Sequence, residues 1–232
     1  MPQSPSVCES SFPKVTDDRR LRSIVAKLTM RYGIDRHSNL RDAFWELIFI
    51  IISVRTADRL YKPTYKNVKR RYPTIDALAA ARLTDLTSIL KPAGLSTLKA
   101  EQIRNAARSV LRDFGRTGLT RAGRKDPEFL EKYLMRLDGV GVKVAKCVTM
   151  YACDSEALPV DAHVWRVMSR LGYAPGGRLT EQKALQLEER VNSKLRLPVH
   201  VLCISHGREI CRPTPQCGTC PVSALCPSTR LD

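Results

Sequence analysis

The sequence has no apolar run long enough to cross a membrane. The longest, AFWELIFIIISV at 43–54, contains Glu46 and is about half the roughly 20 residues that a spanning helix needs, so it predicts a buried core helix. MPQSPSVCESSFPK at the N-terminus lacks the apolar centre of a signal peptide, and residues 1–16 are expected to form a disordered leader. We therefore expect a cytoplasmic protein, nucleoid-associated if bacterial.

Acidic residues are scarce relative to basic ones. The chain has 23 Asp and Glu against 39 Lys and Arg, a formal net charge of +16, and the basic residues occur through most of its length. A folded surface this positive suits a polyanionic partner. Nucleic acid is the first candidate, an anionic membrane surface the second, and a basic protein without such a partner the third.

Alternating apolar and polar segments bounded by turns are also missing, and no internal repeat is present. Apolar residues instead recur at three- and four-residue spacing, which predicts an all-α fold of about ten helices. The predicted helical segments are 17–33, 40–54, 57–72, 74–81, 82–90, 98–115, 126–137, 142–153, 162–172 and 180–195.

Four of the eight cysteines are concentrated near the C-terminus. Cys211, Cys217, Cys220 and Cys226 form a C-x5-C-x2-C-x5-C pattern. Such spacing lets thiolates converge on a tetrahedral zinc or a four-cysteine iron–sulfur cluster, and the spacing does not choose between them. A pair of disulfides is the alternative, which a reducing compartment disfavours.

The stretch RLDGVGVKVAKCV at 136–148 places Gly139, Val140 and Gly141 between two predicted helices. A turn of this kind exposes backbone N–H groups at the positive end of the second helix, where a DNA phosphate can approach closely. A tight helix–helix turn without any ligand explains the two glycines equally well.

Lys143 and Asp161 are the candidate reactive residues. Lys143 falls in the first turn of the second helix, where the helix dipole should lower the pKa of its amine and favour the neutral, nucleophilic form. An exposed lysine or a phosphate contact is the alternative. Asp161 precedes the amphipathic segment 162–172 and is a suitable N-cap. A carboxylate there could also stabilise an oxocarbenium-like transition state.

Taken together, LDGVGVKVAKCV, PVDAHVWRV, HGREIC and the terminal cysteines resemble the endonuclease III family of helix-hairpin-helix DNA glycosylases. The resemblance extends upstream to IISVRTAD (51–58) and AGLSTLKAEQIRNAA (93–107) and covers roughly residues 17–228. It implies a two-domain glycosylase fold. Residues 37–154 would form a six-helix barrel domain with the helix-hairpin-helix, and 17–36 with 155–232 an iron–sulfur domain with a C-terminal [4Fe-4S] cluster loop.

The resemblance also implies an activity in base excision repair. Lys143 would be the Schiff-base nucleophile and Asp161 the essential carboxylate, acting on a nucleotide flipped out of double-stranded DNA. The substrate would be a duplex with a damaged or mismatched base, a pyrimidine favoured, or an abasic site. The protein would act as a monomer. The cluster on the four C-terminal cysteines would be [4Fe-4S], with zinc less favoured.

The resemblance assigns Arg55, Leu95 and Ser96 to loops that enter the duplex and probe the opposite base. This chain departs from the usual family pattern in three places: the first cysteine interval is one residue shorter, Asp138 replaces a common proline, and Arg55 replaces glutamine. VRTA is closer to relatives that remove thymine or uracil opposite guanine. A monofunctional mismatch glycosylase, in which water is the nucleophile, and a non-catalytic iron–sulfur or zinc DNA-binding protein are therefore the alternatives.

Overall fold

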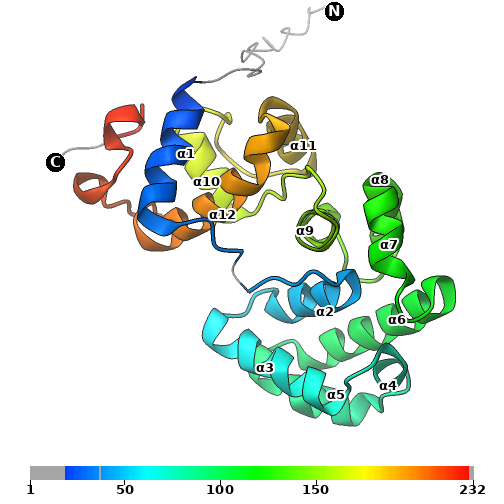
Figure 1. Cartoon of the computed structure of the whole chain (residues 1–232). Helices are drawn as coiled ribbons and strands as arrows, with labels where there is room; N and C mark the ends of the chain where they lie inside the picture. Colours follow the sequence, from blue (N-terminus) through cyan, green and yellow to red (C-terminus); the bar gives the residue numbers. More distant parts are fainter. Residues whose placement is uncertain (1–18, 37, 230–232) are drawn as a thin grey trace, which may run out of the picture.

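The computed structural model describes residues 19–36 and 38–229. These residues form α-helices and three short 3-10 turns, without any strand in the described ranges (Figure 1). The predicted all-α fold is confirmed, and the predicted leader lies outside the described residues. The helices are α1 (Arg19–Tyr32), α2 (Ala43–Ser53), α3 (Asp58–Arg71), α4 (Ile75–Ala79), α5 (Leu83–Leu90), α6 (Ser96–Phe114), α7 (Gly118–Lys125), α8 (Pro127–Leu134), α9 (Val142–Cys153), α10 (Ala162–Arg170), α11 (Glu181–Arg190) and α12 (Ser193–Glu209).

The prediction missed α7 and most of α12. The two glycines of α7 weaken its helical signal, but one of them is required for packing: a Cβ on Gly123 would lie 2.3 Å from Leu130 Cδ2. The predicted segment 180–195 divides at Val191, whose backbone is extended, and a new helix starts there. Asn192 caps α12 by accepting a hydrogen bond from the Lys194 N–H, and the helix continues through Pro198.

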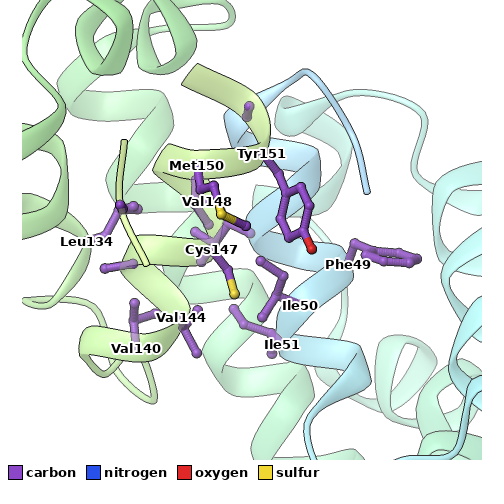
Figure 2. Packing of buried hydrophobic residues seen from close by; sticks show 14 of the residues in the cluster. Phe49, Ile50, Ile51, Leu134, Val140, Val144, Cys147, Val148, Met150 and Tyr151 are labelled. Atoms are coloured by element: carbon purple, nitrogen blue, oxygen red, sulfur yellow. The ribbon is translucent and has the colours of Figure 1, made fainter. Parts of the chain in front are cut away.

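Helix α2 is the centre of the larger group of helices. All its residues except Trp45 and Ser53 are buried, as the apolar run predicts, and it packs against α3, α6 and α9. Figure 2 shows Ile50 and Ile51 of α2 opposite Val144 and Cys147 of α9. This contact holds α9, the helix that carries Lys143, against α2.

Helices α1, α10 and α12 form a second group. Figure 1 shows α1, α10, α11, α12 and the C-terminal segment together, with α9 lying between them and helices α2 to α8. The chain passes between the groups in the segment 154–161, which connects α9 to α10. No helix in the described part of the chain has both the length and the apolarity to span a membrane.

Candidate active site

A tight turn joins α8 to α9, and one of its glycines is required by the backbone. Gly139 has φ +77°, and a Cβ there would lie 2.0 Å from Gln102 Nε2. Val140 is buried, and its N–H donates to Leu137 O. Gly141 has open space where a side chain would be, and it begins α9 without a side-chain cap. Nothing in the protein therefore requires glycine at 141, and a ligand can approach the start of α9 there.

Lys143 lies one residue into α9 and is partly exposed. It lines a cavity of about 290 Å³ between the start of α9, the connecting segment and α11. The walls are mostly apolar, with Val142, Leu158, Val160, Leu179, Ala184 and Leu185 among them. An amine at the edge of an apolar cavity next to open space can meet a ligand that enters from the α8–α9 turn.

The predicted lowering of the Lys143 pKa is wrong. Burial by itself lowers this pKa, but it is outweighed by Cys147, through its charge when ionised and a hydrogen bond, and by the charges of Asp161 and of ionised Glu46, so the pKa is raised. Nearby acidic groups thus decide the direction of the shift. Lys143 is an ammonium ion in the free protein and must lose a proton before it can act as a nucleophile.

Cys147 and Glu46, two of those acidic groups, were not predicted as site residues. Burial raises the pKa of the Cys147 thiol to about 11 and the pKa of the Glu46 carboxyl to about 8. Glu46 is 0% exposed, its Oε2 accepts from the Leu40 N–H at 2.7 Å, and its Oε1 has no hydrogen-bond partner. Asp161 is therefore the neighbour of Lys143 that carries a full charge at neutral pH. The sequence signal that could have identified Glu46 is its position as a carboxylate inside the apolar run 43–54.

Asp161 caps α10, as predicted. Its Oδ1 accepts from the backbone N–H groups of His163 and Val164, both at 2.8 Å. Burial raises the pKa of Asp161, but the charges of His200 and Lys143 and the Val164 N–H lower it more, and the pKa is lowered overall. Since Lys143 and Asp161 each shift the other's pKa, the structure brings the two predicted reactive groups to one site.

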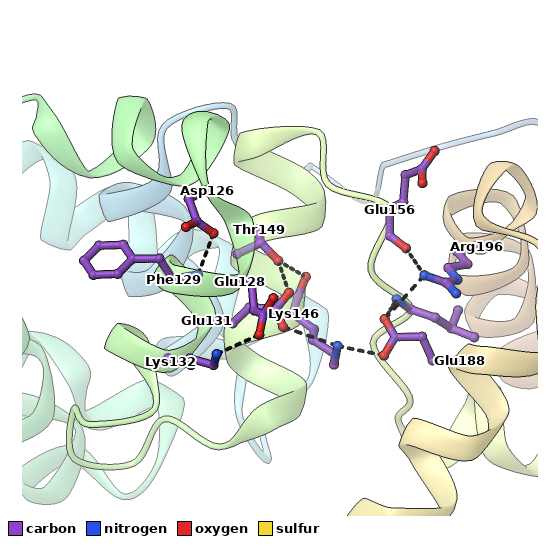
Figure 3. A network of polar contacts seen from close by, with 11 residues as sticks. Asp126, Glu128, Phe129, Glu131, Lys132, Lys146, Thr149, Glu156, Glu188 and Arg196 are labelled. Carbon is purple, nitrogen blue, oxygen red and sulfur yellow. Dashed lines mark hydrogen bonds and ion pairs between the residues drawn. The ribbon is translucent and has the colours of Figure 1, made fainter.

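An ion-pair network next to this site connects the two groups of helices (Figure 3). Lys146 Nζ lies 2.7 Å from Glu188 Oε2 of α11 and 3.3 Å from Glu131 Oε2 of α8. The other oxygen of Glu188 accepts from the Leu158 N–H at 2.7 Å. These side chains are 11–17% exposed, so solvent ions screen their attraction less than they screen a surface pair. The network thus holds the segment that leads to Asp161 against the helix of Lys143.

The residues predicted to enter DNA lie on two adjacent turns. Arg55 follows α2 and Leu95 precedes α6; both are exposed, and both have left-handed backbones, with φ of 53° and 48°. Ser96 is the first residue of α6 and is partly exposed. The turns are connected directly, because Thr56 Oγ1 donates to Ala93 O at 2.6 Å.

The four C-terminal cysteines line one small cavity of about 30 Å³. Arg170 Nη1 donates to Cys211 Sγ at 3.4 Å, and Cys220 Sγ lies 3.6 Å from His206 Nε2. Within 19–36 and 38–229, no three Cys, His, Asp or Glu side chains lie close enough to hold a single metal ion. Four cysteines lining one cavity are the donor set of a group that binds one thiolate at each of several metal atoms, as an iron–sulfur cluster does.

Comparison with known protein families identifies one family that this chain matches. Residues 48–193 match the family described as HhH-GPD superfamily base excision DNA repair protein. The chain is 32% identical to endonuclease III of Thermotoga maritima over 82% of this chain and 85% of that protein. It is 26% identical to endonuclease III of Sulfolobus acidocaldarius over 86% of this chain and 92% of that protein.

Solved structures show the same fold. A non-covalent endonuclease III–DNA complex superposes with a TM-score of 0.78 at 24% identity, covering 90% of this chain and 95% of that one. A thermostable thymine-DNA glycosylase superposes with a TM-score of 0.74 at 24% identity, covering 90% of this chain and 96% of that one.

Proposed function

Because the chain belongs to the endonuclease III family of the HhH-GPD superfamily and is a DNA glycosylase, we propose that Lys143 is its nucleophile and Asp161 its essential carboxylate. Abasic-site lyase activity is typical of this family, and Lys143 would provide it here. The observation that carries the proposal is that Lys143 in α9 and Asp161, the N-cap of α10, lie close enough for the charge of each to shift the other's pKa.

In this proposal the protein binds double-stranded DNA and flips the target nucleotide toward Lys143, because C1′ cannot be reached inside the base stack. The neutral amine of Lys143 bonds to C1′ while the glycosidic bond breaks, and the base leaves with the electron pair and takes up a proton. Asp161 stays ionised because its pKa is lowered, and its charge stabilises the oxocarbenium-like sugar.

The lyase step continues on the same amine. The nitrogen expels the ring oxygen and forms an imine at C1′, and the proton of C2′ is then lost as the C3′–O bond breaks and the 3′ phosphate departs. Asp161 takes part in these proton transfers. The raised pKa of Lys143 means that its ammonium must first give up a proton to solvent.

DNA binding is supported by charge and by open backbone. The net charge of +16 gives sequence-independent affinity for phosphates, and the start of α9 at Gly141 offers N–H groups with no side chain in the way. We propose that Arg55, Leu95 and Ser96 occupy the gap left by the flipped nucleotide. An arginine at 55 can donate to guanine acceptors, so a pyrimidine opposite guanine is the favoured target.

A [4Fe-4S] cluster on Cys211, Cys217, Cys220 and Cys226 is the proposed cofactor, and the cavity that these residues share supports it. When bound, the cluster would hold the C-terminal segment in place against α10 and α12. The two groups of helices are the proposed domains, with 37–154 as the barrel domain and 17–36 plus 155–232 as the cluster domain.

Purified protein is expected to contain iron and acid-labile sulfide in equal amounts, measured by colorimetric assay, and to show a broad visible absorption band. Replacing Cys217 with serine should remove the band, because a four-cysteine cluster needs each thiolate. Cys153→Ser is the matched control, since Cys153 is buried in α9 away from the cavity, and it should keep the iron. Zinc without sulfide in the native protein would refute the cluster.

The test of the proposed function is borohydride trapping of the native protein on a duplex with one abasic site. We expect a covalent adduct, because borohydride reduces the imine between Lys143 and the opened sugar. A preparation that binds the duplex, releases the base from a guanine–uracil duplex and gives no adduct would show a monofunctional glycosylase instead. A preparation that binds the duplex and does neither would be a DNA-binding protein without this activity.

A further inference from the structure

Lys99 is a buried lysine that the proposed chemistry does not use. Its side chain is 2% exposed, and it lies one turn before Ile103 on the apolar face that α6 turns toward the core. Burial lowers the pKa of its amine. A cation is costly in such a position unless its hydrogen bonds are satisfied, so its partners indicate why a lysine is there.

The four acceptors of Lys99 lie in the last turn of α2, on the turn that carries Arg55 and on the turn before Leu95. Its Nζ donates to Ile52 O at 2.8 Å in the last turn of α2, and to Val54 O and Thr56 Oγ1 at 2.9 Å each on the turn that follows. Its Nζ also lies 2.9 Å from Ala93 O, on the turn before α6, so the three N–H groups of the ammonium serve four acceptors and one N–H is shared between two of them. One ammonium group thus connects segments about forty residues apart and satisfies carbonyl oxygens that the end of α2 leaves without partners.

The two turns need such support because both are strained. Arg55 and Leu95 are two of the four non-glycine residues with positive φ among the described residues. A left-handed backbone is unfavourable for side chains with a Cβ and persists only where the surrounding structure enforces it. Their side chains are exposed, with Leu95 at 49%, so packing of the side chains themselves does not enforce it.

We propose that Lys99 is a positioning residue that joins the Arg55 turn and the Leu95 turn into one rigid element, so that both side chains enter the duplex together. The inference rests on the proposed role of these two residues in DNA. The relative position of the two turns, which one buried ammonium group sets, then determines how well the enzyme displaces and probes the base opposite the lesion. Lys99 itself does not touch DNA.

The test uses 2-aminopurine placed opposite a tetrahydrofuran abasic analogue, which the enzyme cannot cleave. The fluorescence of 2-aminopurine rises when it leaves the base stack, so it reports insertion of the two turns. Native protein at saturation should raise the fluorescence. Lys99→Met, which keeps the apolar stem and removes the ammonium, should lose most of that rise while still giving a trapped adduct on single-stranded abasic DNA, where no opposite base exists.

Two further variants separate positioning from stability. Leu78→Ala makes a cavity in α4, which packs against the far part of α6 through the Arg108 contact with Ala79 O; it should destabilise the protein and keep the fluorescence rise. Thr56→Val removes one of the four acceptors and the direct link to Ala93. Because this change is small and partly exposed, the variant should fold and show an intermediate rise.

The outcomes are distinct. An equal rise with native protein, Lys99→Met and Thr56→Val would overturn the positioning role and leave the proposed function untouched. Loss of the rise in Leu78→Ala as well would mean that the effect is one of stability, and would also overturn it. No rise with native protein would overturn both the DNA role of the two turns and the role of Lys99, whereas trapping on abasic duplex would still decide the nucleophile.

Discussion

The Lys143→Gln variant should form no borohydride-trapped adduct with a duplex that contains an abasic site. Glutamine has a similar length, but its amide nitrogen cannot form an imine, so lyase activity should be lost entirely and base excision should fall by several orders of magnitude, because the proposed nucleophile is gone. The measurement is denaturing gel electrophoresis of end-labelled DNA after borohydride treatment, with duplex binding measured in parallel.

Lys132→Gln is the matched control for this variant. Lys132 lies on α8 of the same hairpin, is exposed, and pairs with Glu128 one turn away, so its loss should leave the adduct intact. Because the pKa of Lys143 is raised, adduct formation by the native protein at saturating DNA should also speed up as pH rises through neutrality. A Lys143→Gln protein that still gives the native adduct would place the nucleophile elsewhere.

The Asp161→Asn variant should fold normally and excise bases about 10²–10³ times more slowly. Asparagine caps a helix as well as aspartate does, so the hydrogen bonds from the His163 and Val164 N–H groups can be kept while the charge is removed. The expected loss is that of one preorganised electrostatic contact to the developing positive sugar. Single-turnover excision and thermal unfolding should be measured on the same preparation.

Asp154→Asn is the corresponding control. Asp154 ends α9, pairs with Arg36 and Arg41 at the surface, and is not among the charges that shift the Lys143 pKa, so its replacement should leave the rate unchanged. Excision by Asp161→Asn at the native rate would mean that Asp161 is an N-cap alone. A lowered melting temperature together with a lowered rate would point to a folding defect.

Local patterns in the sequence were sufficient to predict most helices, the α8–α9 turn and the cap at Asp161. Each of these depends on residues within one or two helical turns, so apolar spacing, glycine and capping residues carry the information. Helix α7 and the continuation of α12 past Pro198 were missed because packing against distant segments overrides weak local propensity there.

Net charge and the order of the motifs along the chain likewise indicate DNA as the partner and this family as the relatives. What the tertiary structure alone decided is the electrostatic state of the buried groups. Lys99 and Glu46 lie on apolar helix faces where periodicity predicts hydrophobic residues, and their partners come from other segments. The direction of the Lys143 pKa shift was mispredicted from the helix dipole for the same reason: Cys147 and Asp161, the latter eighteen residues away, raise this pKa and outweigh burial, and only the folded chain sets those distances.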